Sequence, residues 1–236
     1  MMSDAPTDSD GPILDTHRLR IAADTGLSAL EFDLQVLAGE LHLLYLRDRR
    51  TATTVADALL GIGSAGGTVR YLGQAWHDLD HDASLRLRRG IGRVRGDGNW
   101  NETRPVIDSV LLPARHNGVV EDRVLREQAG KLAQRFGLPG LPTELPARCL
   151  VSDLERAACV RAFLGRPVLV ILEHPMQFED SAMLAPLIEA IQQVRRRGGA
   201  VLWFTEHRQL AADRGIPADR RHHVVGSQLH PLGGRP

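Results

Sequence analysis

The segment that most limits how this chain can fold is a short strand without polar alternation, from Val168 to Leu172. A strand that is apolar at every position is buried on both faces, as the strands of a parallel sheet are. An amphipathic helical stretch precedes it, and two ionisable residues, Glu173 and His174, follow it directly. Open α/β sheets bind their ligands at the carboxyl ends of the strands. The segment therefore predicts an α/β fold with a site near Glu173.

Composition narrows the class of protein. The 236 residues are 43% hydrophobic, which is enough for one large core, or for one core with a subdomain. The formal net charge is zero, so nothing in the charge indicates a nucleic-acid partner. No apolar run approaches the roughly 20 residues that span a bilayer. The two cysteines, Cys149 and Cys159, form no disulfide or metal framework, which favours a cytoplasmic location.

The pattern along the chain predicts one domain over residues 13–236, after a polar, acidic N-terminus (residues 1–12) that we expect to be disordered. Strands are expected over residues 13–46, followed by a helix that opens at Thr53 or Thr54. Residues from about 100 to 165 are predicted to form a mostly helical insert. Within it, Ser152 and Glu155 have the spacing of a capping box.

Two stretches resemble the ATP-binding subunits of ABC transporters. The run AACVRAFLGRPVLVILEHP resembles the family's signature helix followed by its Walker B strand, and PVIDSVLLPARHNG resembles the segment after the Q-loop. The resemblance extends from about residue 13 to residue 229. It implies an α/β, P-loop-NTPase-like core with an antiparallel β subdomain and a helical subdomain.

The phosphate loop of that family, G-x-x-x-x-G-K-[ST], surrounds phosphates with backbone N–H groups and neutralises them with lysine. The matching positions here are Leu46 and Thr51 for the glycines, Ala52 for the lysine, and Thr53 with Thr54 for the hydroxyls. Only the hydroxyl positions keep the family's residue types. Arg49 or Arg50 is an alternative phosphate ligand.

The resemblance assigns further vestigial positions. They are Gly96 for the Q-loop glutamine, Leu150, Val151 and Ser152 in the signature, Glu173 and His174 in Walker B, Asp180 in the D-loop, and Glu206 for the switch histidine. Phosphoryl transfer depends on positioned groups and electrostatics, and most of these residue types supply neither. We therefore expect no catalytic residues, no metal and no cofactor.

The resemblance favours a catalytically degenerate subunit, a pseudo-ATPase, that docks on a membrane permease at the inner face of the membrane in a structural or regulatory role. It would act as a homodimer, or as a heterodimer with another ABC ATP-binding subunit, and without nucleic acid. Trp100, Val106 and Val110 are the expected docking residues. One alternative is a weakly active ATPase that binds ATP and Mg²⁺ weakly. Another is a soluble scaffold or regulatory module.

Overall fold

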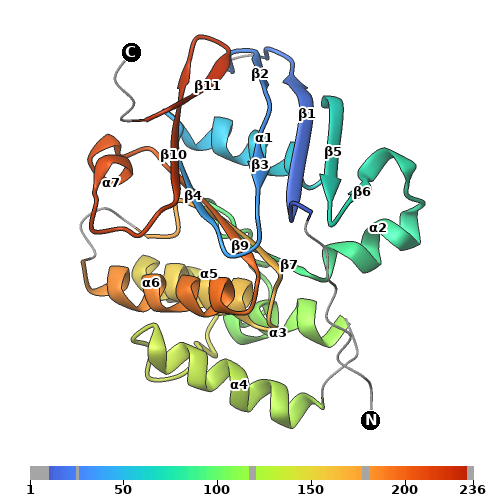
Figure 1. Ribbon diagram of the computed structural model, residues 1–236. Helices are drawn as coiled ribbons and strands as arrows, with labels where there is room; N and C mark the ends of the chain where they lie inside the picture. Colours follow the sequence, from blue (N-terminus) through green and yellow to red (C-terminus); the bar gives the residue numbers. More distant parts are fainter. Residues whose placement is uncertain (1–10, 25–26, 117–120, 177–180, 233–236) are drawn as a thin grey trace.

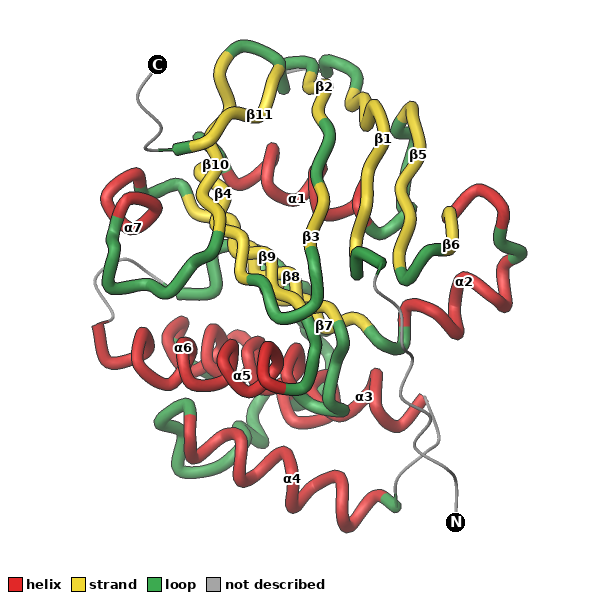
Figure 2. Tube along the Cα trace, in the orientation of Figure 1, coloured by secondary structure: helices red, strands yellow, loops and turns green. Residues whose placement is uncertain are grey.

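A computed structural model of the chain describes residues 11–24, 27–116, 121–176 and 181–232 (Figure 1). The first ten residues of the predicted disordered N-terminus lie outside these ranges. Figure 2 shows an antiparallel sheet, a helix, a mostly parallel sheet and a group of helices stacked one on another.

The central layer is a six-stranded sheet in the order β11-β10-β4-β9-β8-β7. Its strands are β4 (Leu41–Tyr45), β7 (Ile91–Val94), β8 (Leu169–Glu173), β9 (Ala200–Thr205), β10 (Arg220–Val225) and β11 (Gln228–Pro231). Neighbours from β10 to β7 are parallel, and β11 pairs antiparallel with β10. Every residue of β8 and β9 is buried, which confirms the prediction of a strand covered on both faces.

The second sheet is antiparallel and confirms the predicted β subdomain. Its strands are β1 (Leu14–Ile21), β2 (Leu30–Phe32), β3 (Gln35–Val36), β5 (Gly66–Tyr71) and β6 (Gln74–Ala75). The pairing of β1 with β5 shifts register between His17 and Arg20. Gly67 lies opposite this irregularity with φ +84°, and a β-carbon there would lie 2.0 Å from the Arg18 carbonyl oxygen. Only glycine fits that position.

Helices cover both faces of the central sheet. They are α1 (Arg49–Leu59), α2 (His81–Arg88), α3 (Val106–His116), α4 (Asp122–Arg135), α5 (Val151–Phe163), α6 (Ser181–Arg196) and α7 (Arg208–Ala212), with short 3₁₀ turns at Trp76–Asp78 and Pro146–Arg148. Helix α1 lies between the two sheets, while α5 and α6 pack on the opposite face, with α4 outside them (Figure 2). Among the described residues, no helix combines the length and the apolar character needed to cross a membrane.

Two helices begin elsewhere than the sequence predicts. Helix α1 begins at Arg49 rather than at Thr53 or Thr54, because the Asp48 side chain caps it by accepting the Thr51 N–H. Aspartate is among the preferred N-cap residues. Helix α5 begins at Val151, and its N-cap, Leu150, makes no side-chain capping bond. The predicted capping box is therefore wrong, because Ser152 already lies inside the helix.

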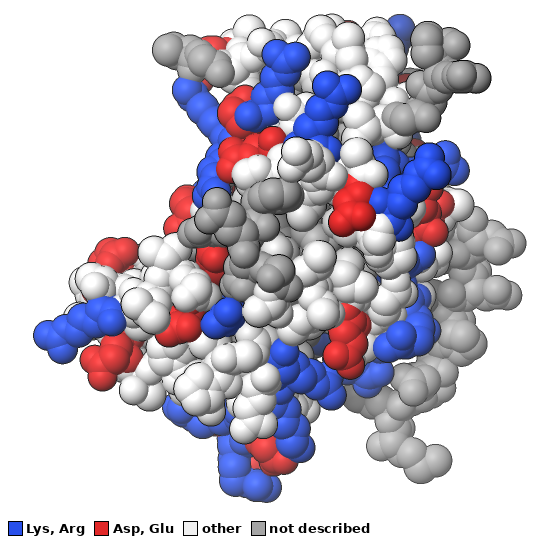
Figure 3. Space-filling model, turned by 90° about the vertical axis from the view of Figure 1, so that its left-hand side faces the viewer, with Lys and Arg blue, Asp and Glu red and all other residues white. Residues whose placement is uncertain are grey.

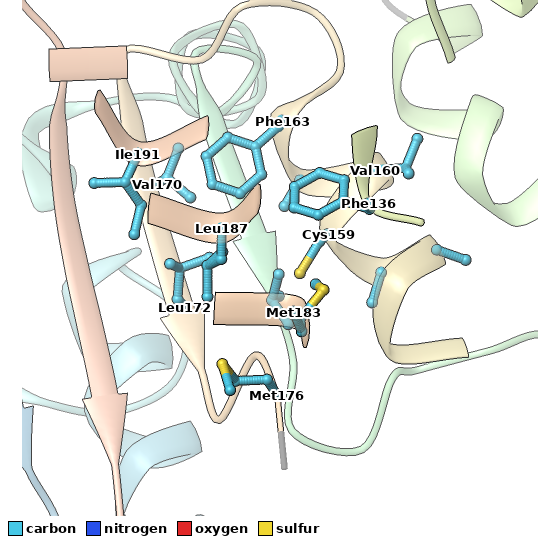
Figure 4. Close-up of a cluster of buried hydrophobic side chains, with 14 of the residues drawn as sticks. Phe136, Cys159, Val160, Phe163, Val170, Leu172, Met176, Met183, Leu187 and Ile191 are labelled. Atoms are coloured by element: carbon cyan, nitrogen blue, oxygen red, sulfur yellow. The ribbon is translucent and has the colours of Figure 1, made fainter. Parts of the chain in front are cut away.

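A separate hydrophobic cluster lies on each face of the central sheet. Figure 4 shows the cluster under α5 and α6, where Phe163 from α5 and Ile191 from α6 lie over Val170 and Leu172 of β8. Phe136, just after α4, lies 5.9 Å from Phe163 between ring centroids. The helical insert is thus joined to the sheet through one continuous core.

We expect Leu172→Ala to lower the free energy of unfolding by about 2–5 kcal/mol, because it leaves a cavity under α5 and α6. Leu112→Ala is the matched control: Leu112 is 60% exposed, whereas Leu172 is fully buried, and a change at an exposed site costs roughly 0.5 kcal/mol or less. Urea denaturation measures both. Equal losses in the two variants would contradict the arrangement of this core.

Candidate functional site

The turn that matches the phosphate loop is closed by the protein itself. Asp48 Oδ1 accepts the Thr51 N–H at 2.7 Å, and Asp48 Oδ2 accepts the Thr51 hydroxyl, also at 2.7 Å. Leu46 and Ala52 are buried in the core, and the Thr54 hydroxyl donates to the Arg50 carbonyl. A carboxylate therefore occupies the start of α1, where the positive end of the helix dipole attracts an anion.

The Walker B position lies in a buried ion network. The carboxylate of Glu173 is completely buried. Its Oε1 accepts Nε of Arg93 at 2.5 Å, and its Oε2 accepts the Thr53 hydroxyl at 2.7 Å. Arg93 also donates to Asp57 Oδ1 at 2.6 Å. The network joins β7, β8 and α1 through one guanidinium, which balances the charge of the buried carboxylate.

His174 faces the same region from the end of β8. It is buried, has a left-handed backbone (φ 47°), and its Nε2 has no hydrogen-bond partner among the described residues. Burial lowers the pKa of His174 to about 4, so the imidazole is neutral near pH 7. A β-carbon on Gly96 would lie 3.6 Å from the His174 ring. The Q-loop and Walker B positions are therefore neighbours.

Glu206, the switch-histidine position, is paired rather than free. Its carboxylate accepts Nε of Arg49 at 3.2 Å, and Arg49 also reaches the Gly96 carbonyl at 3.5 Å. Arg50, the other candidate phosphate ligand, pairs with Asp24 at 2.9 Å. Both arginines are thus engaged within the chain.

The three signature positions lie at the start of α5. Leu150 and Val151 are 69% and 62% exposed at the start of α5, so this helix end presents apolar groups to solvent. Ser152 lies in the first turn of the same helix. Asp180, the D-loop position, lies outside the described residues.

The three proposed docking residues fall into two groups. Val106 and Val110 are fully buried in the core, because their face of α3 packs on α5. Neither has surface to offer a partner. Trp100 is half-buried: its ring lies 4.6 Å from the Arg161 guanidinium, and it lines a small cavity of about 170 Å³ with Gly96, Val151 and His174.

Thr53 and Glu173 occupy the positions where the family's motifs place groups that bind Mg²⁺. Each has an oxygen that could bind a metal ion. However, the Thr53 hydroxyl already donates to Glu173, and Glu173 also accepts a hydrogen bond from Arg93. The anion position at α1 is likewise filled by Asp48. As arranged, these side chains do not fit a metal-bound phosphate at this position.

Sequence reasoning missed Asp48, Arg93 and Asp57. For two of them, Asp48 and Arg93, the sequence does contain a pattern that could have identified their roles. Asp48 precedes the hydroxyl-rich start of a helix, as an N-cap residue does. Arg93 interrupts an otherwise apolar strand, and a charge in such a strand requires a buried partner. Nothing in the sequence pairs Asp57 with Arg93, since 36 residues separate them.

Comparison with known proteins shows which proteins the chain is similar to. No protein-family model matches the chain. The ABC transporter ATP-binding protein YbbA of Escherichia coli is 27% identical over 226 residues, covering 92% of this chain and 96% of YbbA. The macrolide export ATP-binding/permease protein MacB of Chlorobium luteolum is 23% identical over 212 residues, covering 88% of this chain and 32% of MacB.

Solved structures agree on the fold. The dimeric ATP-binding cassette MJ0796, in a post-hydrolysis state bound to ADP and Pi, superposes with a TM-score of 0.76 at 17% identity, over 94% of this chain and 100% of that one. A further dimeric structure of MJ0796, described as a bacterial ABC transporter cassette, gives a TM-score of 0.77 at 16% identity and the same coverage. The predicted ABC ATPase fold is confirmed.

The expectation that the chain takes no cofactor is wrong. YbbA and MacB are named as ATP-binding proteins, and MJ0796 was solved with ADP and phosphate. The expectation rested on side-chain types at single positions, whereas nucleotide contacts in such folds also come from the backbone and from neighbouring elements. Along nearly its whole length the chain is similar to ABC transporter ATP-binding proteins, and it has the fold of the solved ABC cassettes.

Proposed function

We propose that the protein is a catalytically degenerate ATP-binding subunit, which docks on the membrane permease of a transport system and has a structural or regulatory role there. The observation that carries the proposal is the buried network of Arg93, Glu173, Thr53 and Asp57. Each of these side chains is bonded to another of the four, so the carboxylates and the hydroxyl are already engaged within the chain. Phosphoryl transfer depends on such positioned charges.

The neighbouring groups support the same proposal. A general base at neutral pH works best with a pKa near 7, whereas burial holds the pKa of His174 near 4. Glu206 adds a negative charge beside it and is held by Arg49. None of these groups is arranged to activate water.

The partners follow from the relatives. MacB carries a permease together with its ATP-binding part, and MJ0796 forms a dimer. We extend both associations to this chain as part of the proposal, with peripheral attachment at the inner face of the membrane. On the face shown in Figure 3, basic and acidic side chains are interspersed, which suits a protein partner better than nucleic acid.

The network should matter for stability. We expect Arg93→Met to lower the free energy of unfolding by about 3–5 kcal/mol, because it leaves Glu173 buried without a cation. Adding Glu173→Gln removes the second charge and should recover much of the loss. Arg126→Met is the control: Arg126 pairs with Asp122 at 2.7 Å on the surface, and such a pair contributes roughly 1 kcal/mol or less. Similar losses at Arg93 and Arg126 in guanidinium denaturation would contradict the role of the network.

Turnover should be absent. We expect purified protein to release no phosphate from Mg-ATP above background between pH 6 and pH 9. Burial lowers the pKa of His174 to about 4, which makes the imidazole a weak base, and Glu173 is already bonded to Arg93 and Thr53. His174→Ala and Glu173→Gln should then leave the rate unchanged. A wild-type rate that disappears in His174→Ala would instead support an active, slow ATPase.

Trp100 is the remaining candidate for permease docking. We expect Trp100→Ala to reduce co-purification of the cognate permease from detergent, because interface energy concentrates in aromatic anchors. Leu112→Ala is a control at another exposed apolar site of the helical region. Thermal melting must accompany the measurement, since Trp100 also packs on Arg161. Full binding by Trp100→Ala, or a binding loss that only follows a lower melting temperature, would exclude this docking site.

A further inference from the structure

A cavity of about 250 Å³ lies away from the candidate functional site, between α3, α4, α5 and the start of β7. It is lined by Ile91, the first residue of β7, whose register partner is Leu169 at the start of β8. Glu173 is at the other end of β8, so the cavity lies at the amino edge of the central sheet. Within the described residues, none of the nucleotide-motif positions lines it.

The wall of this cavity is mainly apolar. Its apolar side chains include those of Ile91, Val110, Pro113, Leu125, Leu164 and Pro167. The two prolines have no backbone N–H, so they add apolar surface without a donor. One turn of an α-helix, about 5 Å long and about 10–12 Å across, is larger than this cavity. An alkyl chain is narrow enough to enter, and burial of its methylene groups favours binding.

A basic cleft adjoins the apolar cavity. The cleft has a volume of about 210 Å³ and lies between α4, the turn after α5 and the end of α6. Three residues line both spaces, namely Gln128, Leu164 and Gly165. The charged side chains of the cleft are those of Lys131, Arg135, Arg166 and Arg197, and no acidic residue is among its lining residues in the described ranges. Acidic and basic residues are equally numerous in the whole chain, so the cleft is a local concentration of positive charge.

Two of these four cations are available to a ligand. Lys131 pairs with Glu127 at 2.7 Å, and Arg135 donates to Gln193 at 3.2 Å. By contrast, within the part of the chain that the structure describes, no side-chain hydrogen bond or ion pair involves Arg166 or Arg197. Partial burial, and then the charge of Arg166, lower the pKa of Arg197. Two guanidinium groups without a counter-charge favour an anion, which can accept charge-assisted hydrogen bonds from both.

The backbone holds Arg166 in an uncommon conformation. Gly165 and Arg166 are both left-handed, with φ 84° and φ 58°, in the tight turn between α5 and β8. A residue other than glycine is uncommon in this region, and such strained residues gather at ligand sites. The same turn supplies Gly165 to the wall of both spaces and Arg166 to the basic cleft.

We propose that the two spaces together bind a small anionic amphiphile, with its alkyl chain in the apolar cavity and its carboxylate at Arg166 and Arg197. Each space alone is smaller than the roughly 300–1,000 Å³ of small-molecule sites, whereas their combined volume falls in that range. The outermost helix, α4 (Figure 2), forms part of both walls through Gln128. The inference does not depend on the proposed function, because the site lies at the other edge of the sheet.

Calorimetric titration of the full chain tests the proposal, with octanoate, acetate and octan-1-ol as probes. Octanoate should bind more tightly than the other two, since only octanoate has both the chain and the anion. Arg166→Asn and Arg197→Gln should each weaken octanoate binding about tenfold, as the loss of one charge-assisted hydrogen bond does, and leave octan-1-ol binding unchanged. Asparagine tolerates the left-handed backbone at position 166. Arg123→Gln is the matched control, because Arg123 is exposed on α4 and lines neither space.

A second variant tests the apolar cavity. Ala114 on α3 lines it and is partly buried, so the larger side chain in Ala114→Phe should occupy the space of the alkyl chain. Octanoate and octan-1-ol should both bind about tenfold more weakly, as the exclusion of two methylene groups does. Leu112→Phe is the control, because Leu112 is 60% exposed on the same helix and does not line the cavity.

Four results would overturn the inference. One is the absence of octanoate binding at millimolar concentration, and another is wild-type octanoate affinity in both arginine variants. The third is acetate binding as tight as that of octanoate, which would indicate a simple anion site. The fourth is binding to phosphatidylglycerol vesicles without binding of octanoate, which would indicate a membrane surface as the partner. Melting curves show whether each variant is folded, and the arginine variants decide the matter if Ala114→Phe is not.

Discussion

The guanidinium of Arg93 is the group on which the arrangement of the site depends. It bridges the buried carboxylate of Glu173 and the carboxylate of Asp57, and through Glu173 it also holds the Thr53 hydroxyl. An unpaired carboxylate in this position would cost several kcal/mol. The sheet can therefore keep an acidic residue at the end of β8 only because an arginine on β7 reaches it. The same bonds fix α1 against the sheet.

At the start of α1, too, a side chain of the protein supplies the hydrogen-bond partner, in this case Asp48. The first N–H groups of a helix have no partner within the helix, and in a phosphate loop the ligand supplies the partner. Here a side chain two positions after a buried leucine supplies it instead. Arg49 is also paired, with Glu206. The phosphate-loop region therefore contains ion pairs at positions where the family's motifs would leave hydrogen-bond donors free for a phosphate. These ion pairs and hydrogen bonds hold the region together without a ligand.

Arginine has a second role away from the site, where it fixes loops by bonding to carbonyl oxygens. Arg221 holds the α7 segment, and Arg195 on α6 donates to the carbonyls of Gly39 and Pro217 and to Asp219. Both clamps connect segments that precede or follow strands of the central sheet. The guanidinium suits this task because its five donors point in fixed directions. Such clamps fix the loops that lead into β4 and β10.

Much of the fold could be predicted from local patterns. The apolar run at β8 identified a strand that is covered on both faces, because burial leaves a direct trace in residue type. The start of α1 was placed several residues too late, since the hydroxyls of Thr53 and Thr54 gave the same capping signal as Asp48. Val106 and Val110 were assigned to a surface, although their spacing fits a buried helix face equally well.

The sequence by itself determined the layered α/β class, the buried strand and the loss of the lysine and glycines from the phosphate loop, because each of these is a matter of residue type at neighbouring positions. The tertiary structure alone decided which charges meet. Arg93 lies 36 residues from Asp57 and 80 from Glu173, and Tyr45 becomes a neighbour of His223 only when β4 and β10 pair. Contacts across such separations depend on strand order and register, and no local pattern specifies these.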